Sequence, residues 1–174
     1  CFKTKTNYSS YSYINKSSNE ILNDINKADR VFKKNLKKKR NIFRTPHFGE
    51  FCEKNSMNII YKIISKLGYK VSLSTSPIHS LVNRPIYYKK DIMEIPCNAY
   101  IKNPRQIIDS WSLGSDLKMI DMVNELEKYF QNMNINNLLL NTYFDPSDVV
   151  NENSFFSAIA KLSKYQLKKI EDIQ

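Results

Sequence analysis

Glycine is scarce in this chain, with three residues among 174. A glycine-rich phosphate loop needs several glycines close together, because its backbone must approach the phosphate closely, so this sequence excludes that kind of nucleotide site. Long apolar runs are also missing: the longest, such as residues 138–140, are far shorter than the roughly 20 residues of a membrane-spanning helix. The sequence therefore predicts no membrane insertion, no cofactor and no small-molecule substrate.

Cysteine and histidine are also few. Cys1, Cys52 and Cys97 are odd in number and show no Cys-x-x-Cys spacing, so neither a disulfide framework nor a structural zinc site is predicted. Cys52 and Cys97 are expected to be small buried thiols in a reducing compartment. His47 and His79 are the two histidines that could act as bases near neutral pH.

Positive charge, in contrast, is abundant and lies at one end. Residues 1–46 hold nine Lys and three Arg against Glu20, Asp24 and Asp29, which gives +9 of the total charge of +10. The chain is therefore interpreted as a basic arm, residues 1–46, on a nearly neutral body, residues 47–174. The densest cations of the arm are Lys33, Lys34, Lys37, Lys38, Lys39, Arg40 and Arg44.

Such a cluster is typical of proteins that bind a polyanion, because each cation that meets a phosphate releases counterions. A solvated helix end or a localisation signal would give the same composition. RNA is favoured over bare duplex DNA, since Phe32, Ile42 and Phe43 lie among the cations and could pack where the arm threads into folded RNA.

Periodicity within the arm predicts one amphipathic helix after a polar, extended tail at residues 1–16. Ser17 and Glu20 have the spacing of a capping box, which marks the start of the helix. Apolar residues then recur at helical spacing and predict a buried stripe. Its members are Ile21, Leu22, Ile25, Ala28, Phe32 and Leu36.

The body alternates helical and strand patterns. Helices are predicted from Ser56 to Leu67, ending at Gly68, from Ser115 or Asp116 to Phe130, and from Asn153 or Ser154 to Ile173. Strands are predicted at 69–73, 106–109 and 137–143, with short strands or single turns at 86–88 and 92–95 in a proline-rich stretch. This order predicts one α/β domain with a mostly parallel sheet flanked by helices.

Two stretches of the body resemble the small-subunit ribosomal protein two family, the bacterial and organellar type. The first is His47-Phe48-Gly49, followed by Asn55, Met57 and Tyr61 at nearly the family's spacing. The second is Leu138 to Thr142 with Asp145, Pro146 and Val149, which is similar to the family's buried strand and Asp-Pro turn before its last helix. Ile107, Ile108 and Asp109 resemble the end of the preceding strand. The family's Trp-Leu-Gly-Gly segment and coiled-coil insertion have no counterpart here.

The resemblance implies an α/β domain seated on small-subunit rRNA with no catalytic role. A reduced, diverged mitochondrial member would carry its basic arm as an extension that binds rRNA and neighbouring ribosomal proteins. The expected location is therefore the ribosome of the mitochondrial matrix, with Lys33 to Arg44 on rRNA phosphates.

Other functions fit parts of the sequence. A basic RNA-cleaving nuclease, as a toxin or viral enzyme, could use His47 or His79, and a surface lipoprotein or viral interaction protein could carry a lipid on Cys1. Residues 74–76 with Glu125 and Glu127 are similar to elements of ADP-ribosyltransferases, and residues 153–156 are similar to the nucleophile segment of ovarian-tumour-type deubiquitinases. A periodic helix explains the glutamates and a helix cap explains the second segment.

Overall fold

The computed structural model describes Tyr13 and residues 16–36, 41–45, 54–109, 119–135, 139–144 and 153–173. The described residues fall into two compact units. The first takes its residues from Cys1–Ala99, Asn103–Ile107 and Leu139–Asn141, and the second from Tyr100–Lys102, Ile108–Leu138 and Thr142–Gln174.

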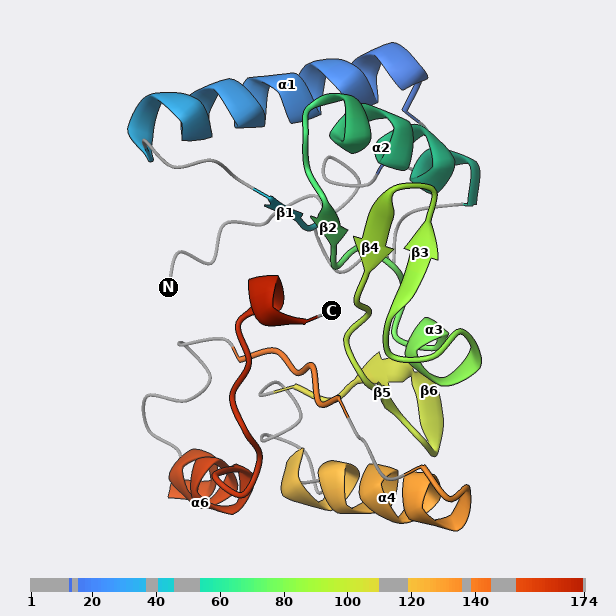
Figure 1. Cartoon of the computed structure of the whole chain (residues 1–174), viewed down its shortest axis with the longest axis vertical. Helices are drawn as coiled ribbons and strands as arrows, with labels where there is room; N and C mark the ends of the chain where they lie inside the picture. Colours follow the sequence, from blue (N-terminus) through green and yellow to red (C-terminus); the bar gives the residue numbers. More distant parts are fainter. Residues whose placement is uncertain are drawn as a thin grey trace, which may run out of the picture. The chain divides into compact units, whose positions relative to one another are not determined.

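The first unit contains a four-stranded sheet in the order β1-β2-β4-β3, visible in Figure 1. Its strands are β1 (Ile42–Phe43), β2 (Val71–Ser72), β4 (Ile92–Glu94) and β3 (Tyr87–Lys89). β1 pairs parallel with β2 and β2 parallel with β4, whereas β3 is antiparallel to β4. The predicted α/β class with a mostly parallel sheet is therefore confirmed.

Three helices accompany this sheet: α1 (Ser18–Asn35), α2 (Lys54–Lys66) and the single turn α3 (His79–Val82). α2 begins two residues before the expected Ser56 and ends next to Gly68, whose φ of 84° is the left-handed conformation expected after the helix. The apolar face predicted for α2 is confirmed, because Met57, Ile60, Ile63 and Ile64 are buried and Leu67 packs against them.

The core of the first unit lies where α1 and α2 meet the sheet. Ile60 and Ile64 of α2 and Ile92 of β4 are fully buried in one apolar cluster with Ile21 and Ile25 of α1. Burying side chains of this size contributes about 1.5–3 kcal/mol each. The same cluster includes Tyr13, in the segment that the sequence assigns to an extended tail.

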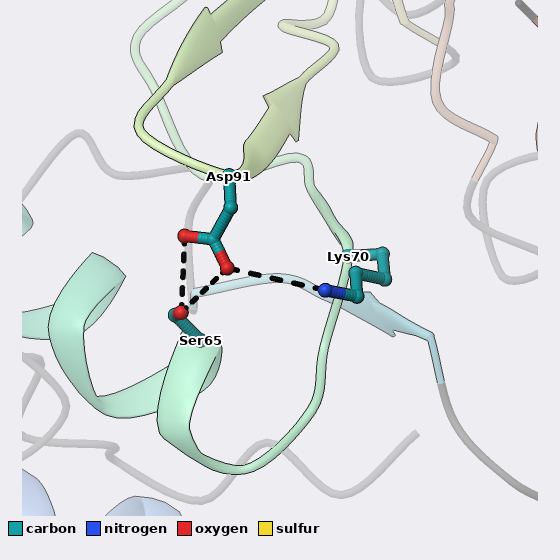
Figure 2. A network of polar contacts seen from close by, with 3 residues as sticks. All are labelled: Ser65, Lys70 and Asp91. Carbon is teal, nitrogen blue, oxygen red and sulfur yellow. Dashed lines mark hydrogen bonds and ion pairs between the residues drawn. The ribbon is translucent and has the colours of Figure 1, made fainter.

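A polar contact holds the turn between β3 and β4 against the end of α2 (Figure 2). Ser65 Oγ donates to both carboxylate oxygens of Asp91, at 2.7 and 3.0 Å, and Lys70 Nζ lies 3.9 Å from Asp91 Oδ2. The hydrogen bond from Ser65 lowers the pKa of Asp91 from its ordinary value. The neighbouring Lys90 has a positive φ of 57°.

β1 brings part of the basic arm into the sheet. Ile42 and Phe43 pair with Val71 and Ser72, and the backbone N–H of Thr45 donates to Ser74 Oγ at 2.9 Å. The sequence contains no strand-length apolar run here, so its periodicity predicts no strand in this segment. α1 and β1 are both elements of the first unit.

The second unit contains the helices α4 (Met119–Asn132) and α6 (Asn153–Leu162) and a 3-10 turn at Ile170–Asp172. The start predicted for α4 at Ser115 or Asp116 lies outside the described residues. Its predicted apolar face is confirmed at four described positions, which are all buried: Ile120, Val123, Leu126 and Phe130.

A two-stranded sheet joins β5 (Ala99–Tyr100) to β6 (Asn103–Ile107). The strand expected at 106–109 therefore begins earlier, and it contains Pro104. Proline is tolerated because each strand of a two-stranded sheet is an edge strand, whose outer side has no partner that needs a backbone N–H. Asp109 forms an isolated parallel bridge with Tyr143.

Two predictions for the C-terminal third are wrong in extent. Residues 139–142 form no strand: Asn141 instead exchanges backbone and side-chain hydrogen bonds with Asn98, and its amide donates to the carbonyls of Ile95 and Pro96. α6 ends at Leu162, well before Ile173. The helical period continues beyond it without burial, since Leu167 is 96% exposed.

Candidate nucleic-acid interface

The start of α1 is fixed by the capping box that the sequence predicts. Glu20 N donates to Ser17 Oγ at 3.3 Å, and Ser17 N donates to Glu20 Oε2 at 2.7 Å. The Ser17 hydroxyl, which donates to Glu20 Oε2 at 2.7 Å, and the Ser17 backbone N–H lower the pKa of Glu20, so its carboxylate stays charged at the positive end of the helix.

The first half of α1 is docked on the body by three buried residues one turn apart. Ile21 and Ile25 enter the apolar core, and Asp29 follows them with 4% of its surface exposed. Asp29 Oδ1 accepts a hydrogen bond from Tyr69 Oη at 3.1 Å, and Asp29 Oδ2 lies 2.7 Å from Lys33 Nζ. A buried carboxylate needs such partners, because an uncompensated charge in the core would be strongly destabilising.

Tyr13 adds a second tie between α1 and α2. Its hydroxyl donates to Asp24 Oδ2 at 2.7 Å, and its backbone carbonyl accepts from Ser56 Oγ at 3.1 Å. The N-terminal half of α1 is therefore held by polar contacts on both sides of its buried stripe.

Apart from Ile21, Ile25 and Asp29, the described side chains of α1 are largely exposed. The apolar stripe expected to be buried is buried only at Ile21 and Ile25, while Leu22, Phe32 and Leu36 are 38%, 48% and 51% exposed. Phe32 and Leu36 are on the same side of the helix as Ile21 and Ile25, but the described part of the body does not extend to bury them.

The predicted cations are described in part. Lys33 and Lys34 form the last turn of α1, where positive charge is favourable, and Arg44 is exposed directly after β1. Lys37, Lys38, Lys39 and Arg40 lie outside the described residues. Lys33 is held by Asp29, so it differs from Lys34 in having an internal counter-ion.

Lys27 and Arg30 were not predicted as site residues. Both are exposed on α1, and they share one face with Lys34, since residues three and four apart are neighbours on a helix. The sequence shows this shared face as the spacing i, i+3, i+7, but the positive charge is denser in the lysines that follow.

Comparison of the chain with protein-family models, curated proteins and solved structures finds no match.

A second polar cluster lies at the carboxyl ends of β2 and β4, where parallel sheets often bind ligands. Glu94 is fully buried, and its Oε1 accepts from the backbone N–H groups of Ser74 and Thr75 at 2.7 and 3.0 Å and from Thr75 Oγ1 at 3.1 Å. Its Oε2 accepts from Tyr61 Oη at 2.9 Å. Two successive backbone N–H groups form a typical anion site, which the protein fills with its own carboxylate.

Two tyrosines extend this cluster. Burial and the negative charge of Glu94 raise the pKa of Tyr61, so its hydroxyl remains a donor. Tyr87 Oη donates to Thr75 Oγ1 at 3.0 Å, which completes a chain of hydrogen bonds from the edge strand β3 to Glu94. The cluster clamps α2 and the loop after β2 to β4.

The other residues singled out in the sequence belong to different units. Ser74 and Thr75 bind Glu94, whereas Glu125 and Glu127 of α4 contact Lys102 and Lys164 in the second unit. The periodic-helix explanation of the glutamates therefore agrees with the structure.

His79 lies on the single turn α3. Its Nδ1 is 2.7 Å from Asn83 Nδ2, and burial lowers its pKa. Cys97 is buried, as expected, while His47, Cys1 and Cys52 lie outside the described residues.

Within the ranges that the structure describes, no three His, Cys, Asp or Glu side chains come together as a metal site. Across the same ranges, every helix is too short or too polar to cross a membrane.

Proposed function

We propose that this protein is a structural, non-catalytic constituent of the mitochondrial small ribosomal subunit, bound to rRNA and to neighbouring ribosomal proteins. The observation that carries the proposal is the exposed, cation-rich second half of α1. Lys27, Arg30 and Lys34 are exposed there, and the sequence adds further cations immediately after the helix. Such a surface fits a polyphosphate chain.

The arrangement of α1 supports a fixed surface. A flexible charged tail would lose conformational freedom when it binds, whereas α1 is already ordered by its capping box and by Ile21, Ile25 and Asp29. The resemblance of the body to the small-subunit ribosomal protein two family supports ribosomal RNA as the RNA that is bound.

The non-catalytic part of the proposal is supported by the Glu94 cluster. Its carboxylate is buried and accepts four hydrogen bonds, which is the arrangement of a structural clamp. No small-molecule substrate is proposed.

Sedimentation tests the proposal directly. The epitope-tagged protein should sediment with the mitochondrial small subunit in a sucrose gradient and leave it after ribonuclease treatment. A variant with Gln at Lys33, Lys34, Lys37, Lys38, Lys39, Arg40 and Arg44 should be released at lower salt. A protein that sediments freely at low salt would contradict the proposal.

Incubation of the purified protein with RNA tests the catalytic alternative. We expect the RNA to remain intact. Cleavage that is lost in His47→Ala or His79→Ala would replace the structural function with a nuclease.

A further inference from the structure

The cations of α1 are not distributed evenly around the helix. At 3.6 residues per turn, Lys27, Arg30 and Lys34 fall within a narrow arc and span about 10 Å along the axis. This outward stripe lies roughly opposite the buried residues Ile21, Ile25 and Asp29, and all three cations are exposed. The docked side of α1 therefore determines which cations face outward.

The rotational setting of α1 depends on Asp29. Its hydrogen bond from Tyr69 fixes one side of the helix against the segment that leads into β2 (Figure 1 shows α1 beside α2). Lys33 lies next to this buried edge and is engaged by Asp29 at 2.7 Å. The structure thus separates Lys33, which has an internal partner, from the three cations of the outward stripe.

The chemistry of the stripe indicates its partner. Proteins that bind single-stranded RNA combine cations with aromatic side chains on which bases stack. The outward stripe contains no aromatic residue, and Phe32 lies on the opposite side of α1. Double-helical RNA is recognised chiefly through its shape, phosphates and 2′-hydroxyl groups, which suits a rigid helix that offers only cations.

We infer that the outward stripe of Lys27, Arg30 and Lys34 binds the phosphates of double-helical RNA. This inference rests on the proposed RNA-binding function and specifies its surface and the form of the RNA. Affinity is expected to depend on salt and not on base sequence, because the deep, narrow groove of an RNA duplex does not admit side chains to the base edges.

Filter binding with the full chain tests the inference. The probes are an RNA duplex of 16 base pairs and a single strand of the same length. The test variant is Lys27→Gln/Arg30→Gln/Lys34→Gln, and the control is Lys62→Gln/Lys66→Gln/Lys128→Gln, which removes the same charge from exposed positions elsewhere. Helix content is checked for both by circular dichroism.

The wild type should prefer the duplex. The stripe variant should lose about tenfold or more in duplex affinity, and the slope of log affinity against log salt should become shallower by about 2 to 3, as expected for three lost phosphate contacts. The control variant should change by much less. Lys27→Arg/Lys34→Arg, which retains the charges, should bind like the wild type.

The outcomes separate the two claims. Wild-type protein that binds neither probe would overturn both the proposed function and the stripe. If the wild type binds but the stripe and control variants weaken equally, the RNA contacts lie elsewhere and only the stripe is overturned. A stripe variant that loses single-strand binding more than duplex binding would also overturn the duplex assignment.

Discussion

Tyr69 Oη donates a hydrogen bond to the buried carboxylate of Asp29 over 3.1 Å, and this contact joins α1 to the segment that enters β2. Tyr69 also packs edge-on against Phe43 of β1, with ring centroids 5.7 Å apart. One side chain therefore connects the first helix, the first strand and the turn after α2.

Removing this hydroxyl tests the connection. Tyr69→Phe keeps the ring but takes a hydrogen bond from a buried carboxylate, so the free energy of unfolding should fall by about 1–3 kcal/mol. Tyr88→Phe, at a tyrosine that is 65% exposed, is the matched control and should change stability by less than about 0.5 kcal/mol. Urea denaturation followed by circular dichroism measures both. Equal stability of the two variants would show that the contact contributes nothing.

Glu94→Gln should be more destabilising. Its amide nitrogen would face donors, either the N–H groups of Ser74 and Thr75 or the hydroxyl of Tyr61, where the carboxylate now accepts. We expect a loss of about 3 kcal/mol. Asp121→Asn, at an exposed carboxylate of α4, is the control. A loss in the free energy of unfolding below about 1 kcal/mol for Glu94→Gln would mean that the four hydrogen bonds of the Glu94 carboxylate contribute little to stability.

The contact of Asp91 with Ser65 predicts a pH dependence. Because the folded-state pKa of Asp91 lies below the ordinary value of 3.8, its contribution to stability is complete above that pH and is lost as the pH falls through the folded-state pKa. Ser65→Ala removes the main cause, so the NMR titration midpoint of the Asp91 carboxyl should rise toward 3.8. An unchanged midpoint would assign the shift to the backbone hydrogen bond that Asp91 accepts and to the charges of Lys70 and Lys90.

The turn between β3 and β4 offers a stabilising substitution. Lys90 adopts a φ of 57°, which costs a residue with a Cβ about 1 kcal/mol and costs glycine almost nothing. Lys90→Gly should therefore raise the free energy of unfolding by up to about 1 kcal/mol. Lys89→Gly, in β3 where no positive φ is required, should lower it. If both glycines destabilise the protein, the side chain of Lys90 contributes more than its backbone strain costs.

Elements with strong periodicity and caps could be predicted from the sequence. α1 was expected because apolar residues recur at helical spacing after a cap at Ser17. α2 was expected because the same spacing ends at Gly68, which adopts the left-handed conformation. The short strands β3 and β4 lie where the sequence predicts short strands or single turns between prolines. β1 was not, since two paired residues in a cationic run carry too little hydrophobic signal.

The polar ties could not be predicted because they depend on tertiary contacts. Asp29 looks like an ordinary surface charge until Tyr69, forty positions away, is brought beside it. Glu94 ends a short apolar strand, and nothing in the neighbouring sequence predicts the four donors that surround its carboxylate. The spacing of Lys27, Arg30 and Lys34 places the outward stripe on one face of a helical wheel, but the charge density of the sequence is higher in the lysines that follow.

The two parts of α1 differ in what keeps them folded. The part up to Asp29 shares the cooperative unfolding of the core through Ile21 and Ile25, whereas the last third, residues 30–35, is exposed at every position and is ordered only as the continuation of that docked part. Its backbone amides should therefore open and exchange with solvent well before those of the docked part. A partner bound along the outward stripe would slow the exchange of these amides, so amide protection along α1 measures whether the stripe is occupied.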